Sequence, residues 1–86
     1  MRYQVMTEVP PEEVLERAKR FFADHTRMEV EEETDDSLAF RGEIGRARLR
    51  VGREHNHTAV HAETDRVVGL DVTDVTKRFL YTLDRA

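Results

Sequence analysis

The chain has 86 residues, which is the size of one small domain, and its composition excludes several classes of protein. Hydrophobic residues make up 38% and charged residues 37%, so the apolar side chains suffice for one core under a densely charged surface. The absence of cysteine excludes disulfides, thiolate metal sites and cysteine nucleophiles, and the net charge of −4 argues against a general affinity for nucleic acid.

The sequence indicates neither a targeting segment nor a membrane-spanning segment. No apolar run approaches the roughly 20 residues that a membrane helix needs. The N-terminal residues also lack the apolar stretch of a signal peptide. We therefore expect a single soluble domain over residues 1–86, located in the cytoplasm, with neither a membrane nor a nucleic acid as its partner.

A strand and a helix are predicted at the start of the chain. Apolar and polar side chains alternate over residues 2–9, and the pattern ends at Pro10. Pro11 suits the first turn of a helix, and apolar side chains then recur at helical spacing through residues 11–25. Glutamates stand at the start of this segment, where the helix dipole favours negative charge.

Four further strands are predicted in the middle of the chain. Alternation and turn-forming residues place them at 28–32, 38–40, 46–51 and 57–64, with turns at 34–36, 42–45 and 52–56. In the second strand, the alternation puts Glu32 on the side that faces the core. The meander is uninterrupted by helices, which argues against a ferredoxin-like fold.

Residues 70–83 are predicted to form a closing helix. Val72, Val75, Phe79 and Leu83 fall three, four and four positions apart, which is the spacing of one helix face. Asp71 is the expected N-cap of this helix.

These elements predict an α+β fold with the order strand, helix, four strands, helix. If the first strand pairs with the fifth, a five-stranded, curved, antiparallel-rich sheet results with the order 1-5-4-3-2. Both helices then pack on one face of that sheet and bury their apolar faces.

The order of elements resembles a shortened helix-grip domain of the START-like, Bet v1-like and polyketide cyclase-like proteins. The segments that carry the resemblance are PPEEVLERAKRFF after the first strand and LDVTDVTKRFLYTL at the end. The resemblance implies a sheet that wraps the C-terminal helix, with a small apolar ligand held between them. Members of that family typically have seven strands, whereas five are predicted here.

The aromatic and aliphatic side chains expected between the sheet and the helices have two interpretations. They line an apolar ligand site, as the resemblance implies, or they fill the core themselves, which we favour in a chain of this length. The residues concerned are Tyr3, Phe22, Phe40, Leu49, Val75 and Phe79.

A polar patch is predicted on the other face of the sheet. It comprises Arg41, Arg46, Arg48, Arg50, His57 and His61. Such a patch receives a phosphate, an acidic peptide or single-stranded nucleic acid, or it forms a ladder of opposite charges with neighbouring glutamates. We favour the ladder, because few aromatic residues lie among these positions.

Neither a metal site nor a catalytic motif is predicted. His57 and His61 are separated by about 13 Å along one strand, and His55 with His57 and Glu54 match no established ligand spacing. The only serine, Ser37, follows an acidic turn, and no glycine-rich phosphate loop is present. We therefore expect no cofactor and lean against an enzyme.

Three functions follow, in order of preference. The first is a small binding or protein-interaction module, and a second copy of the chain is one candidate for its partner. The second is a binder of a small apolar ligand between helix and sheet. The third is a metal-dependent enzyme using His55, His57 and His61.

Overall fold

The computed structural model describes residues 2–66 and 71–84, and it contains every strand and helix predicted from the sequence. The elements are β1 (Arg2–Thr7), α1 (Pro11–His25), β2 (Glu29–Glu33), β3 (Ser37–Gly42), β4 (Gly45–Glu54), β5 (His57–Arg66) and α2 (Asp71–Asp84). Leu70, at which the closing helix was predicted to begin, and the side chain of Asp71, its predicted N-cap, lie outside the described part of the chain.

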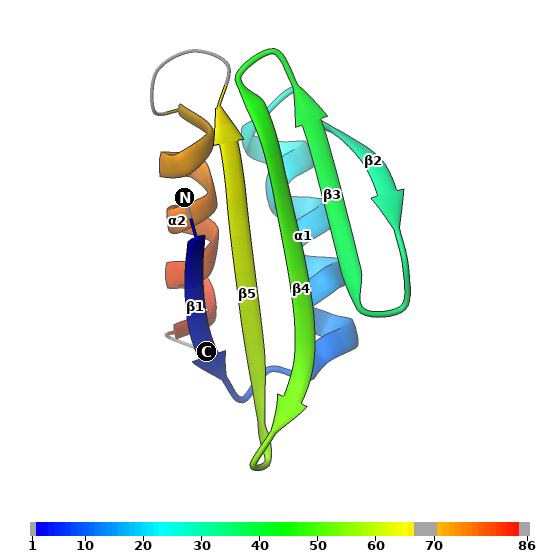
Figure 1. The fold of residues 1–86 in the computed structure, drawn as a ribbon, viewed down its shortest axis with the longest axis vertical. Helices are drawn as coiled ribbons and strands as arrows, with labels where there is room; N and C mark the ends of the chain where they lie inside the picture. Colours follow the sequence, from blue (N-terminus) through cyan, green and yellow to red (C-terminus); the bar gives the residue numbers. More distant parts are fainter. Residues whose placement is uncertain (1, 67–70, 85–86) are drawn as a thin grey trace.

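The five strands form one antiparallel sheet in the order β1-β5-β4-β3-β2, which confirms the predicted topology. Helix α1 carries the chain from one edge strand, β1, to the other edge strand, β2. Both helices lie on the same face, with α1 behind β3 and β4 and α2 behind β1 and β5 (Figure 1). The sheet therefore has an inner face toward the helices and an outer face that no described element covers.

Helix α1 begins at Pro11, where proline is well tolerated because an N–H at the first turn would have no partner in the helix. It buries one stripe of side chains, Val14, Leu15, Ala18 and Phe22, as its spacing predicted. The hydroxyl of Thr26 donates a hydrogen bond to the carbonyl of Phe22 at 2.6 Å and so closes the last turn.

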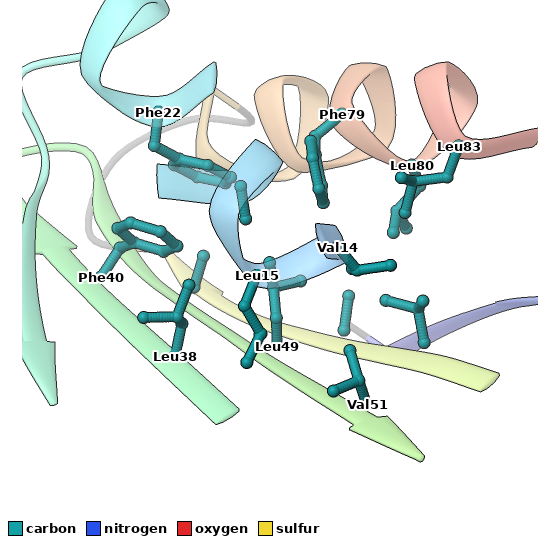
Figure 2. Packing of buried hydrophobic residues seen from close by; sticks show 14 of the residues in the cluster. Val14, Leu15, Phe22, Leu38, Phe40, Leu49, Val51, Phe79, Leu80 and Leu83 are labelled. Carbon is teal, nitrogen blue, oxygen red and sulfur yellow. The ribbon is translucent and has the colours of Figure 1, made fainter. Parts of the chain in front are cut away.

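Three phenylalanine rings join the helices to the sheet. The ring of Phe22 stacks on that of Phe40 from β3, with centroids 4.2 Å apart and planes 6° from parallel. The edge of the same ring meets Phe79 from α2 at 6.1 Å. Figure 2 shows these rings together between the two helices and the strands. The centre of the core therefore lies where α1, α2 and the sheet meet.

Threonine hydroxyls fix α2 to the sheet at both of its ends. Near its start, the hydroxyls of Thr73 and Thr64 from β5 share a hydrogen bond at 3.1 Å. At its end, Thr7 from β1 donates to the carbonyl of Leu83 at 3.0 Å. The predicted stripe of Val72, Val75, Phe79 and Leu83 is at most 5% exposed, which confirms that this face packs on the sheet.

The β4–β5 hairpin is tighter than predicted. Strand β4 continues to Glu54, and the turn contains only His55 and Asn56 instead of residues 52–56. Both turn residues have positive φ, 52° and 69°, as a two-residue type I′ turn requires. The periodic pattern did not reveal this, because positive φ is most often signalled by glycine, and neither residue is glycine.

Strand β2 contains a bulge, and because of it the prediction that Glu32 faces the core is wrong. Val30 pairs with Phe40, but Glu32 pairs with Ala39, so one extra residue separates the two pairs. The bulge turns Glu32 to the outer face and Glu33 to the inner face. Val30 keeps its inward orientation, but it is 44% exposed because it lies on the edge strand beyond α1 (Figure 1).

The inward Glu33 pairs with α1. The ammonium of Lys19 lies 2.7 Å from the carboxylate of Glu33 and 3.1 Å from that of Glu16. Hydrogen bonding to Glu33, and then to Glu16, raises the pKa of Lys19. This ion pair joins the edge strand to the helix layer.

The hairpin turn provides a test of its geometry. We expect Asn56→Gly to raise the free energy of unfolding by about 0.5–1 kcal/mol, because glycine adopts positive φ without steric cost. Asn56→Ala should lower it by about 1 kcal/mol for the opposite reason. Urea denaturation of both variants measures the difference, and a change of the same sign in both would contradict a type I′ turn.

The bulge in β2 provides a second test. We expect Glu33→Ala to lower the pKa of Lys19 toward its ordinary value, because the substitution removes the main cause of the shift. Glu32→Ala is the matched control, since its carboxylate lies on the other face of the same strand. An NMR titration of the Lys19 side chain measures both, and a larger effect of Glu32→Ala would show that β2 has a regular register.

Candidate functional site

The six residues predicted to line a ligand site belong to the hydrophobic core or pack against it. Phe22, Phe40, Leu49, Val75 and Phe79 are at most 5% exposed, and Tyr3 is half-buried. The stacked rings of Phe22 and Phe40 leave no room between them for another molecule. An apolar ligand held among these side chains stays a prediction from the family resemblance.

An open depression of about 1150 Å³ lies beside this core. It is formed where the end of α1, the turn between β3 and β4, and one side of α2 come together. Side chains from all three segments line it, among them His25, Met28, Ile44, Val75, Arg78 and Tyr81. Of the six predicted ligand-site residues, Val75 is the one that also reaches this depression.

The floor of the depression is apolar. Met28 and Val75 are buried in it, Ile44 is half-buried, and the ring of Tyr81 stands at its side with 62% of its surface exposed. The absence of a side chain at Gly42 leaves room for Met28, because a Cβ at this position would lie 2.9 Å from Cγ of Met28. The floor therefore depends on close packing between the α1–β2 connection and β3.

The rim of the depression is charged with both signs. Its basic side chains are Arg27, Arg41, Lys77 and Arg78, and its acidic side chains are Asp24, Glu29, Glu43 and Asp74. Within residues 2–66 and 71–84, Arg41 is the rim residue that forms an ion pair, with Glu31 at 3.6 Å. The other rim charges are available to a bound molecule, apart from Lys77, whose ammonium lies 5.2 Å from the centroid of the Tyr3 ring.

A row of rings connects the rim to the core. The exposed ring of His25 lies 4.3 Å from that of Phe21, and Phe21 lies 5.6 Å from Phe79. This continuity anchors one wall of the depression to the most buried part of the molecule. A molecule bound there would contact side chains that pack against the core.

A second, smaller depression of about 440 Å³ adjoins the first. The two share Glu29, Arg41, Gly42 and Glu43, and the smaller one continues to the exposed side chain of Val30. The two depressions therefore lie next to each other, the larger beside α2 and the smaller beside the edge strand β2.

The predicted polar patch lies on the outer face of the sheet. The register places Arg46 beside Arg41, and Arg50 beside His61, with His57 farther along the same face. Arg41 and Arg46 pair with Glu31 at 3.6 and 3.9 Å, so part of the expected charge ladder is present. In the described part of the chain, Arg48 and Arg50 have no carboxylate within ion-pair distance.

The histidines do not converge on a metal site in the residues that the structure describes. No three histidine, aspartate or glutamate side chains among them lie close enough to hold one ion. His55 is in the hairpin turn, and His57 is opposite Glu54 at its base.

Of the floor residues, Val75 was singled out by the sequence analysis as a ligand-site residue, whereas Met28, Ile44 and the adjacent Tyr81 were not. Ile44 lies within a glycine-bounded turn, and Tyr81 lies off the apolar stripe of α2. Each is an apolar side chain outside the periodic pattern, and that is the signal by which the sequence could have indicated them. Met28 was predicted as a strand residue, and it lies just before β2 instead.

No helix in the described residues is long and apolar enough to cross a membrane. Comparisons with protein-family models, with curated proteins and with solved structures gave no match to this chain. The resemblance to helix-grip domains therefore stays a prediction based on the order of elements.

Proposed function

We propose that this domain is a protein-interaction module that binds a segment of a partner protein in the depression beside α1. The observation that carries the proposal is the apolar floor of Met28, Ile44 and Val75, with the exposed Tyr81 beside it and charges around it. No other function has as specific a basis in the described residues.

The composition of the site supports a protein partner. Protein interfaces have an apolar centre, enriched in tyrosine, methionine and arginine, inside a polar rim. Tyr81 and Arg78 are residue types on which binding energy often concentrates. Met28 adapts its shape to different apolar groups because its side chain is unbranched and flexible.

The shape of the site supports an elongated partner segment. Pockets for small molecules usually enclose about 300–1,000 Å³ and bury most of the ligand. The larger depression is open to solvent, and the smaller one extends it toward Val30. A peptide segment fits such a groove better than a compact molecule does, with one apolar side chain on the floor.

Selection of peptides from a random library on the immobilised domain tests this proposal. We expect selected peptides to carry an apolar or aromatic residue between charged ones. Their affinity should fall about tenfold or more in Ile44→Asp and in Tyr81→Ala, because loss of an anchor contact costs on the order of 2 kcal/mol. Isothermal titration calorimetry gives the affinities.

Met6→Asp is the matched control, since Met6 is 40% exposed but lies on the outer face of the sheet. Equal loss of binding in the control would contradict the proposed site, as would unchanged binding in both site variants. Sedimentation over a range of concentrations shows whether a second copy of the chain supplies the segment.

A small apolar ligand is the second candidate, because Val75 belongs both to the core and to the depression. In that case, titration with a long-chain fatty acid should saturate and shift the methyl resonances of Met28, Ile44 and Val75. At a concentration 100 times its Kd, the ligand should stabilise the fold by about 2.7 kcal/mol. An absence of saturable shifts would exclude it.

A further inference from the structure

Arg48 and Arg50 are two neighbouring cationic side chains at the centre of the outer face. Both are exposed and lie two positions apart on β4, which has a strand on each side. Side chains at such positions point the same way and are separated by about 6.6–6.8 Å. The backbone of a central strand holds this spacing constant.

These two arginines differ from the other arginines of that face. Arg2 pairs with Glu63 at 3.7 Å, and Arg41 and Arg46 share Glu31. Among the residues that the structure describes, Arg48 and Arg50 have no such carboxylate partner. Their guanidinium groups can therefore each donate two hydrogen bonds to an added carboxylate.

The neighbours of Arg50 favour an anion. Its cross-strand neighbours are Ser37 on β3 and His61 on β5, and Gln4 on β1 stands beside His61. His61 and Gln4 each carry a hydrogen-bond donor, whereas the hydroxyl of Ser37 is hydrogen-bonded to that of Thr34 at 2.6 Å. Arg48 has Ala39 on one side and Glu63 on the other, and Glu63 forms its ion pair with Arg2 at 3.7 Å.

An apolar row follows the arginines along the face. The register aligns Gly52 with Ala59, and Ala59 with Met6, in the next row of outward positions after Arg50. In this row Met6 is 40% exposed and Gly52 is exposed, whereas Ala59 between them is buried, so Met6 on β1 is the accessible apolar side chain. The step after the two cations along β4 is therefore Gly52, and Met6 lies in the same row, two strands to the side.

We propose that the outer face binds an extended acidic segment of a partner protein, with its carboxylates on Arg48 and Arg50. Side chains at alternate positions of an extended peptide repeat at the same spacing as those of β4. The preferred sequence is then acidic, any, acidic, any, apolar, with the apolar residue over Gly52 and its side chain directed across Ala59 toward Met6.

A peptide fits this surface better than nucleic acid does. Carboxylates stand on both sides of the arginine pair, on β5 next to β4 and on β2 beyond β3, and they repel a continuous phosphate backbone. They are Glu29, Glu31, Glu32, Glu63 and Asp65. The described residues of this face also include no phenylalanine, tyrosine or tryptophan on which bases would stack.

This surface is independent of the depression beside α1, which lies on the helix side of the molecule. The residues that define it, Arg48, Arg50 and Met6, do not line the depression. Failure of one proposal therefore leaves the other unaffected.

Fluorescence anisotropy with two labelled peptides tests the proposal. One contains glutamate, glycine, glutamate, glycine and leucine in that order, and the other has the same composition with adjacent glutamates. We expect the alternating peptide to bind more tightly, and Arg48→Gln with Arg50→Gln to weaken it about tenfold or more. Arg48→Lys with Arg50→Lys should give an intermediate loss, because lysine keeps the charge but not the bidentate geometry.

The matched control is Arg20→Gln with Arg53→Gln, which changes the net charge equally at two exposed arginines elsewhere. It should leave the affinity within about twofold of the original protein. Thermal denaturation of each variant confirms that it is folded.

Three results would overturn the proposal. The first is equal binding of both peptides or equal loss in the control, which indicates non-specific attraction. The second is tighter binding of an oligothymidylate than of the peptide, which indicates nucleic acid. The third is salt-sensitive self-association that Arg48→Gln with Arg50→Gln abolishes, without peptide binding, which indicates a second copy of the chain.

Discussion

The structure depends on the contact that Phe22 makes with Phe40 and Phe79, because this contact holds both helices to the sheet. Phe22 comes from the helix that links the two edges of the sheet, Phe40 from β3, and Phe79 from the closing helix. Fully burying one such side chain contributes about 1.5–3 kcal/mol, a large share of the roughly 5–15 kcal/mol that a domain usually has. Phe21 extends the contact to His25, so the wall of the depression rests on the same packing.

Most of the fold was predictable because apolar residues recur at every second position in the strands and at every third or fourth position in the helices, with few interruptions. Ala47, Leu49 and Val51 alternate with arginines, and that alternation fixes both faces of the central strand. A single inserted residue in β2 reverses the orientation of Glu32 and Glu33. The sequence could not predict this bulge, because a run of acidic residues has no apolar–polar alternation that an insertion would interrupt. Local geometry at such points is set by pairing with the neighbouring strand.

The two candidate surfaces were not equally accessible to prediction. Arg48 and Arg50 belong to one strand, so the spacing of the sequence itself placed them side by side. Met28, Ile44 and Tyr81 come from three segments far apart in the chain, and only the packing of the helices on the sheet brings them together. A site of that kind has no local pattern, although an apolar side chain within a turn or off a helix stripe indicates one of its parts.

The small size of the domain explains why both candidate surfaces lie outside its core. Opening a ligand cavity between α2 and the sheet would require removing some of the ring contacts that hold the layers together. Large-to-small substitutions of buried phenylalanine typically cost about 3–5 kcal/mol, which is comparable to the whole stability of many small domains. Five strands and two helices have little apolar surface with which to offset such a loss, so binding is more readily placed where the chain already exposes Tyr81, Met6 and unpaired charge.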